Sequence, residues 1–212
     1  MTWRHLPAPP LAQRLMRWGL GAAVFISLGG TLALALGIAN PPRAPNLHAA
    51  ADLPPLTLAP GAAMAEPLGT LPARAFTLDM QAEWRGHPFT AWGVWLDESP
   101  ARRVFIGLNG AGYSGAWACP PNTVPPGDCA ALHARDGRHT GWRAFPHIRA
   151  AGANTLRLHQ AGDFLEIRIN HELLWHIPYA PPALAWGLWA RASNDSDAQQ
   201  VAGRWWLRDI SP

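Results

Sequence analysis

The run from residue 18 to residue 39 is the feature that most constrains this chain, because its 22 residues carry no formal charge. An α-helix of that length covers roughly 33 Å, which is enough to cross a hydrocarbon core of about 30 Å. Arg14 and Arg17 precede the run, so the positive-inside rule predicts a cytoplasmic N-terminus. We therefore expect a cytoplasmic tail at 1–17, one transmembrane helix at 18–39, and all later residues in the periplasm or outside the cell.

A cleaved signal peptide is the alternative interpretation of this run, since Gly37-Ile38-Ala39 resembles a small-residue cleavage site. The apolar regions of signal peptides are usually about 7–15 residues long, and the present run is longer. Its length favours an anchor that is retained in the cell (inner) membrane as a single-pass segment.

Residues 40–72 differ in composition from the rest of the chain, with eight prolines among 33 residues and many alanines. Proline lacks the backbone N–H that a helix needs, and the segment offers few large apolar side chains for a core. The composition predicts a semi-rigid polyproline linker outside the cytoplasm, with plain disorder as the alternative. The folded domain is then expected at 73–212.

The formal charge of +3 is not concentrated on this expected domain. From residue 73 onwards there are 13 arginines and 12 acidic residues, so that part of the chain carries +1. Most of the basic excess lies instead on the N-terminal tail. Nucleic-acid binding requires a clustered basic surface, so we expect no nucleic-acid partner.

Alternating apolar and polar residues from residue 73 onwards predict β-strands. The alternation is clearest at 155–159 and 164–169, where leucines and isoleucines share one face. Further strands are expected at 74–84, 89–96, 103–109, 112–118, 143–150, 172–177, 185–192 and 200–210. Gly, Pro, Asn and Asp separate these short runs, and no segment has a helical pattern. The pattern predicts an all-β fold of two antiparallel sheets, packed as a sandwich or barrel.

Two neighbouring segments, 152–158 and 162–170, carry a resemblance to a known family. They read Gly-Ala-Asn-Thr-Leu-Arg-Leu and Gly-Asp-Phe-Leu-Glu-Ile-Arg-Ile-Asn, and a strand Trp-Gly-Leu-Trp-Ala follows at 186–190. This order resembles the laminin-G-like, concanavalin A-like lectin/glucanase jelly rolls over residues 75–210. The resemblance implies a two-sheet antiparallel jelly-roll sandwich, preceded here by one transmembrane α-helix.

Glycoside hydrolases of the resembled fold carry closely spaced carboxylates, because the retaining reaction needs two carboxyl groups about 5–5.5 Å apart. Asp79 and Glu83 share a strand face, but the strand rise separates them by about 13 Å. Asp163 and Glu166 fall on opposite faces of their strand. All four are expected to be surface charges, and the protein is expected to have no catalytic residues and no enzyme activity.

Cys119 and Cys129 are the only cysteines, and in an exported domain they are expected to form one disulfide. A metal site at these cysteines would need further ligands, and only His133 is near. Asp195 and Asp197 are candidate calcium ligands, because some laminin-G-like domains bind Ca²⁺ through loop carboxylates. Two carboxylates rarely suffice for Ca²⁺, so a solvated turn is favoured and no cofactor is expected.

Ten of the 12 tryptophans lie within the expected domain. Alternation places Trp92 and Trp95 on opposite sheet faces, so we expect about half of the indoles in the core and half on the surface. The first candidates for a contact surface, towards a partner protein or a glycan, are Trp117, Trp142, Tyr113 and Arg143.

Two functions fit these expectations. The first is a non-catalytic accessory subunit, anchored in the lipid bilayer, whose sandwich docks on and stabilises a larger membrane protein complex such as an electron-transfer complex. The second is a membrane-tethered carbohydrate-binding module, which the lectin-like resemblance implies and the abundant tryptophan supports. Many folds host unrelated functions, so the fold alone does not separate the two.

Overall fold

The computed structural model of the chain describes residues 46–72, 75–179, 185–195 and 199–209. Within these ranges the regular secondary structure consists of fourteen β-strands, so the predicted all-β fold is confirmed. No helix among the described residues is long and apolar enough to cross a membrane. The predicted span at 18–39 lies outside the described residues.

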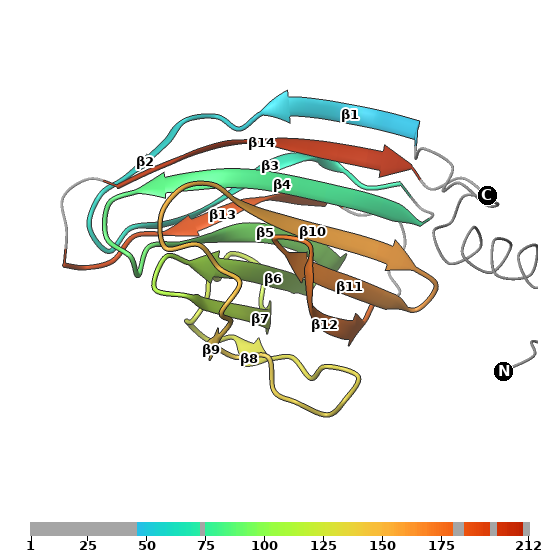
Figure 1. Cartoon of the computed structure of the whole chain (residues 1–212). Helices are drawn as coiled ribbons and strands as arrows, with labels where there is room; N and C mark the ends of the chain where they lie inside the picture. The colour runs from blue at the N-terminus through green and yellow to red at the C-terminus, as the bar shows by residue number, and fades with distance from the viewer. Residues whose placement is uncertain (1–45, 73–74, 180–184, 196–198, 210–212) are drawn as a thin grey trace, which may run out of the picture. The chain divides into compact units, whose positions relative to one another are not determined.

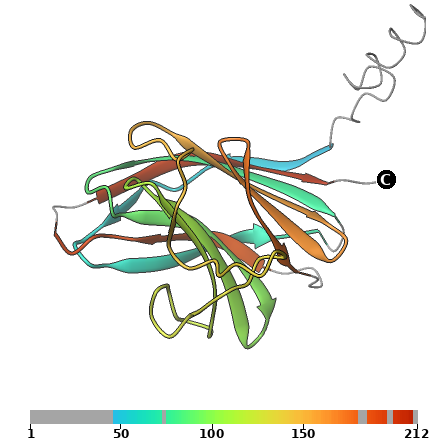
Figure 2. The ribbon, with the colours of Figure 1, turned by 60° about the horizontal axis from the view of Figure 1, so that its bottom comes forward.

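The strands form two antiparallel sheets that pack face to face, which confirms the predicted sandwich (Figures 1 and 2). The first sheet has the order β1-β14-β4-β10-β11-β12, with β2 beside β14. The second sheet has the order β3-β13-β5-β6-β7-β8, with β9 beside β7. In the first sheet the strands are β1 (Asn46–Asp52), β2 (Leu56–Leu58), β4 (Phe76–Arg85), β10 (Asn154–Ala161), β11 (Phe164–Ile169), β12 (Glu172–Pro178) and β14 (Gln199–Asp209). In the second they are β3 (Ala63–Thr70), β5 (Ala91–Ser99), β6 (Arg102–Asn109), β7 (Tyr113–Cys119), β8 (Ala130–Ala131), β9 (Arg143–Ala144) and β13 (Ala185–Arg191).

The alternating pattern located most of these strands to within a few residues, but the strand predicted at 143–150 is wrong over most of its length. Only Arg143 and Ala144 are strand residues there, and β9 pairs with β7. Phe145 and Ile148 instead reach the core from a loop, in which the N–H of Ile148 donates to the carbonyl of Phe145 at 3.2 Å. Pro146 removes a backbone donor between them, which disfavours a longer ladder.

The predicted linker is wrong for residues 46–72, which form three strands of the sandwich. β1 and β2 pair with β14, and β3 pairs with β13. Four leucines of this segment are buried in the core: Leu53, Leu56, Leu58 and Leu71. Pro54 and Pro55 fall between strands, and Pro67 lies on the edge strand β3 beside a register shift, where proline is tolerated. Pairing with distant strands therefore outweighs the local effect of the prolines.

Apolar side chains pack on both faces of the second sheet. The main core lies between the two sheets. A second cluster lies on the outer face of the second sheet and contains Ala91, Trp95, Phe105, Trp117, Cys119 and Trp189. Tryptophans that point to either face of this sheet are therefore buried. The prediction that half of the indoles are exposed is wrong. Of the described tryptophans, Trp142 is exposed and Trp206 is half-buried.

The outer face of the first sheet is polar and carries ion pairs. Asp79 is buried there, because Arg157 and Arg208 both donate to its carboxylate, Arg157 through Nε at 2.6 Å. The expectation of a surface charge is therefore wrong for Asp79. On the same sheet Glu166 accepts a hydrogen bond from Arg168, and this guanidinium holds the pKa of the Glu166 carboxyl below its usual value. Both carboxylates serve as structural ion-pair partners.

Candidate functional site

A row of three residues crosses the outer face of the second sheet where β13, β5 and β6 lie side by side. Arg191 is opposite Ala91 in the strand register, and Ala91 is opposite Asn109. Residues that are directly opposite on neighbouring strands point to the same side of a sheet. The small side chain of Ala91 thus leaves a depression between the longer side chains of Arg191 and Asn109.

The loop that follows β7 forms one wall of this depression. Cys119 and Cys129 are joined by a disulfide, which confirms the predicted pair. Within the closed loop, the carbonyl of Pro125 accepts a hydrogen bond from Arg191 Nη1 at 3.0 Å, and Pro126 lines the depression. The loop and the end of β13 are therefore tied together by the arginine that lines the site.

Three exposed aromatic side chains, those of Phe89, Tyr113 and Trp142, border the depression. Trp142 packs edge-on against Trp117, with ring centroids 4.7 Å apart, and Trp117 packs edge-on against Trp189 at 6.2 Å. Because Trp117 and Trp189 are buried, they hold Trp142 in place while 37% of its surface stays accessible. Such a ring is a rigid, partly apolar platform for a ligand.

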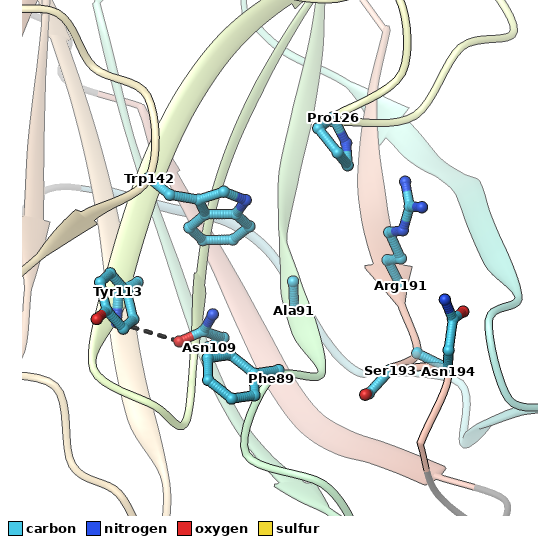
Figure 3. Close-up of a pocket in the computed structure, with 10 residues that line it drawn as sticks. Phe89, Ala91, Asn109, Tyr113, Pro126, Trp142, Arg191, Ser193 and Asn194 are labelled. Atoms are coloured by element: carbon cyan, nitrogen blue, oxygen red, sulfur yellow. Dashed lines mark hydrogen bonds between the residues drawn. The ribbon is translucent and has the colours of Figure 1, made fainter.

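These residues enclose an open cavity of about 380 Å³. Figure 3 shows Trp142, Tyr113 and Phe89 on one side, Arg191, Ser193 and Asn194 on the other, and Ala91 between them. Apolar rings combined with a few polar groups in one concavity are typical of small-molecule sites. The described residues that line the cavity include no carboxylate.

Asn109 supplies a hydrogen-bond donor inside this cavity. The residue is only 5% exposed, and its Oδ1 accepts the backbone N–H of Tyr113 at 3.1 Å. This bond fixes the orientation of the amide, because the N–H of Tyr113 requires an acceptor. The Nδ2 group has no hydrogen-bond partner among the described residues and points towards the side of Trp142 (Figure 3). A nearly buried amide without a protein acceptor is suited to bind a ligand oxygen.

The structure separates the four predicted contact residues. Trp142 and Tyr113 line the cavity, whereas Trp117 and Arg143 do not. Trp117 is 4% exposed, because its indole lies across Gly115 beneath Trp142. Arg143 is exposed outside the cavity, and its Nε donates to the carbonyl of His139 at 2.7 Å.

The candidate calcium loop contributes one described residue. Asp195 is exposed, and its backbone N–H donates to Ser193 Oγ at 3.3 Å. Asp197 lies outside the described residues. In the part of the chain that the structure describes, no three His, Cys, Asp or Glu residues are grouped so that they could hold a metal ion.

Phe89, Asn109 and Arg191 line the cavity but were not predicted from the sequence. Asn109 follows Phe105 and Gly107 on one strand face, and Arg191 follows Trp189 on another. In both strands a polar residue follows apolar or glycine residues that point to the same side of the sheet, and this change could have indicated a site. It did not do so because that side was expected to be exposed to solvent, where polar residues are common.

The described residues thus form a two-sheet β-sandwich with an aromatic-lined cavity on one outer sheet face. No protein-family model and no curated protein matches the sequence. Among solved structures, the carbohydrate recognition domain of Emp46p in its metal-free form is 11% identical, with 77% of this chain and 88% of that chain covered and a TM-score of 0.47.

Two further solved structures show a similar level of likeness. The carbohydrate-binding module CBM66 from Bacillus subtilis is 11% identical, with 77% of this chain and 98% of that chain covered and a TM-score of 0.46. The laminarinase catalytic domain from Thermotoga maritima is 7% identical, with 65% of each chain covered and a TM-score of 0.46. At these values the matches assign neither a family nor a ligand to this chain.

Proposed function

We propose that this domain is a carbohydrate-binding module of the lectin-like jelly-roll class and that it binds its ligand without cleaving it. The observation that carries the proposal is the cavity, in which exposed Trp142, Tyr113 and Phe89 stand beside the donor group of Asn109. A pyranose ring has an apolar face of C–H groups and a rim of hydroxyls. Aromatic rings can stack on the C–H face, and a fixed amide can donate a hydrogen bond to a hydroxyl.

The carboxylates of the domain support binding without hydrolysis. Hydrolysis of a glycosidic bond canonically uses two carboxyl groups that flank the bond. The described residues that line the cavity include none, and Asp79, on the other sheet, is already paired with Arg157 and Arg208. These residues supply neither a general acid nor a nucleophile next to a sugar held at Trp142.

A glycan array probed with the full chain in detergent tests this function. We expect a restricted set of glycans to retain the protein, and the same soluble oligosaccharide to compete for binding. Titration calorimetry with the retained oligosaccharide would then give a single site per chain. Retention of no glycan, or retention that soluble sugar does not reverse, would contradict the proposal.

We further propose that residues 18–39 tether the module to the cell membrane, with 1–17 in the cytoplasm and the sandwich outside it. The support is the uncharged 22-residue run and the arginines that precede it. Alkaline extraction of membranes should leave the chain in the pellet, whereas release into the supernatant would contradict a membrane span. A multi-subunit membrane complex that co-purifies stoichiometrically in mild detergent would favour the role of an accessory docking subunit over glycan binding.

A further inference from the structure

We infer that the cavity selects saccharides that carry a carboxylate, and that Arg191 is the residue that recognises it. This inference rests on the proposed carbohydrate binding and specifies the ligand class. It follows from the charge of the cavity, the hydrogen bonding of Arg191, and the position of Asn109 on the other side of Ala91.

The charge of the cavity favours an anion. Arg191 is the one charged residue among its described lining residues. Asp128 and Asp195 come shortly after the lining residues Pro126 and Asn194 in the sequence, but both are exposed and neither lines the cavity. Arg191 is half-buried and pairs with no carboxylate of the described residues, and such a cation gains most from an anionic ligand.

Arg191 differs in this respect from most arginines of the domain. Seven described arginines form an ion pair with a carboxylate: Arg102, Arg103, Arg138, Arg157, Arg168, Arg204 and Arg208. Arg191 is half-buried and has no such partner among the described residues; its bond is to the carbonyl of Pro125. The fold therefore holds a guanidinium at the site whose charge no carboxylate of the described residues compensates.

The hydrogen bonding of Arg191 leaves the favourable edge of the guanidinium available. Nη1 is occupied by the Pro125 carbonyl at 3.0 Å. Nε and Nη2, which have no partner among the described residues, form the edge that can donate two parallel hydrogen bonds to one carboxylate. Because the Pro125 bond already orders the side chain, less conformational entropy is lost when an anion binds.

Asn109 provides the second polar contact at a suitable distance. Arg191 and Asn109 are both opposite Ala91, so their backbones are separated by two strand spacings, about 10 Å in total. A sugar ring that lies over Ala91 would bring its carboxylate to Arg191 and a hydroxyl or ring oxygen to Asn109 Nδ2. Trp142, which borders the same floor, would then cover one face of the ring.

The test compares uronate oligosaccharides with their methyl esters, which keep the sugar and linkage but lose the charge. Titration calorimetry on the full chain in detergent, with galacturonate, glucuronate and mannuronate trimers, should find an acid that binds at least tenfold tighter than its ester. Arg191→Gln should remove that difference, and Arg191→Lys should restore part of it. Arg204→Gln, which alters an arginine on the other sheet, should bind as the wild type does.

The outcomes distinguish this inference from the function on which it rests. If esters or neutral oligosaccharides bind as tightly as the acids, the inference is overturned and carbohydrate binding stands. If Arg191→Gln keeps the full preference for the acid, Arg191 is not the recognition residue and the inference is overturned as well. If no saccharide binds, both proposals fail together.

Discussion

Gly93→Ala is expected to lower the free energy of unfolding of the domain by about 3 kcal/mol, the upper end of the usual cost of overpacking a core. A Cβ at residue 93 would lie 2.6 Å from the Cα of Gly107 and 2.8 Å from Nε1 of Trp189, and closer still to the carbonyl oxygen of Ile106. Two of these three atoms belong to the backbone of the neighbouring strand, so the clash cannot be relieved by rotating a side chain. Denaturant unfolding followed by tryptophan fluorescence would measure the loss.

The effect is large partly because the buried indole of Trp189 packs directly against the two glycines. Gly93 and Gly107 face each other across β5 and β6, and the indole lies over both of them. This close approach lets Trp189 Nε1 donate to the carbonyl of Ile106 at 3.0 Å. A methyl group at residue 93 would displace the indole and remove that buried hydrogen bond, whose loss adds to the steric cost.

Gly141→Ala is the matched control, because a Cβ at residue 141 would meet only the Cβ of Ala131 at 3.7 Å, an ordinary contact. Its stability should stay within about 1 kcal/mol of the wild type. If Gly93→Ala proved as stable as this control, the indole of Trp189 could not lie over Gly93 and Gly107 as described.

Trp142→Ala is expected to weaken binding of the retained saccharide roughly 30-fold, which corresponds to about 2 kcal/mol. Trp142 forms the largest aromatic wall of the cavity, and its ring is held by buried Trp117. Alanine would remove the platform without disturbing the main core, because Trp142 is exposed and belongs to neither buried cluster. Titration calorimetry with the oligosaccharide would give the change in affinity.

Trp206→Ala provides the same substitution on the other sheet. Trp206 is half-buried on β14 and is opposite Asp79 in the strand register. It lies away from the cavity, so the folded variant should bind the saccharide with unchanged affinity. Equal losses for the two variants would indicate a general effect on folding, and unchanged binding of Trp142→Ala would place the ligand elsewhere on the molecule.

The two substitutions are physically connected through the second aromatic cluster. Gly93 allows Trp189 to lie close to the sheet, Trp189 contacts Trp117, and Trp117 positions Trp142. The buried half of this series contributes stability, and its exposed end borders the cavity. The position of Trp142 therefore depends on side chains that the ligand would not touch.

Sequence patterns predicted most of the strands after residue 75 and the pairing of the two cysteines. Alternation in β10 and β11 reflects which side chains face the core, and this is a local property that a short stretch of chain reveals. The disulfide was predicted because the chain has only two cysteines and the domain was expected to be exported. Trp142 and Tyr113, two of the four residues predicted to contact a partner or glycan, line the cavity, and their contact role stays a prediction.

The pairing of these strands, and which of their faces are covered, depend on contacts between distant parts of the chain. The proline-rich composition of residues 46–72 disfavours regular structure locally, and these residues form strands because β14 and β13 provide backbone hydrogen-bond partners. The buried position of Trp117 and the ion pairs of Asp79 likewise depend on residues that are distant in the sequence. The cavity itself exists because the strand register sets Arg191, Ala91 and Asn109 in one row. Register is set by long-range pairing, so a pattern within any one strand predicts the face of a residue but not its neighbours across the sheet.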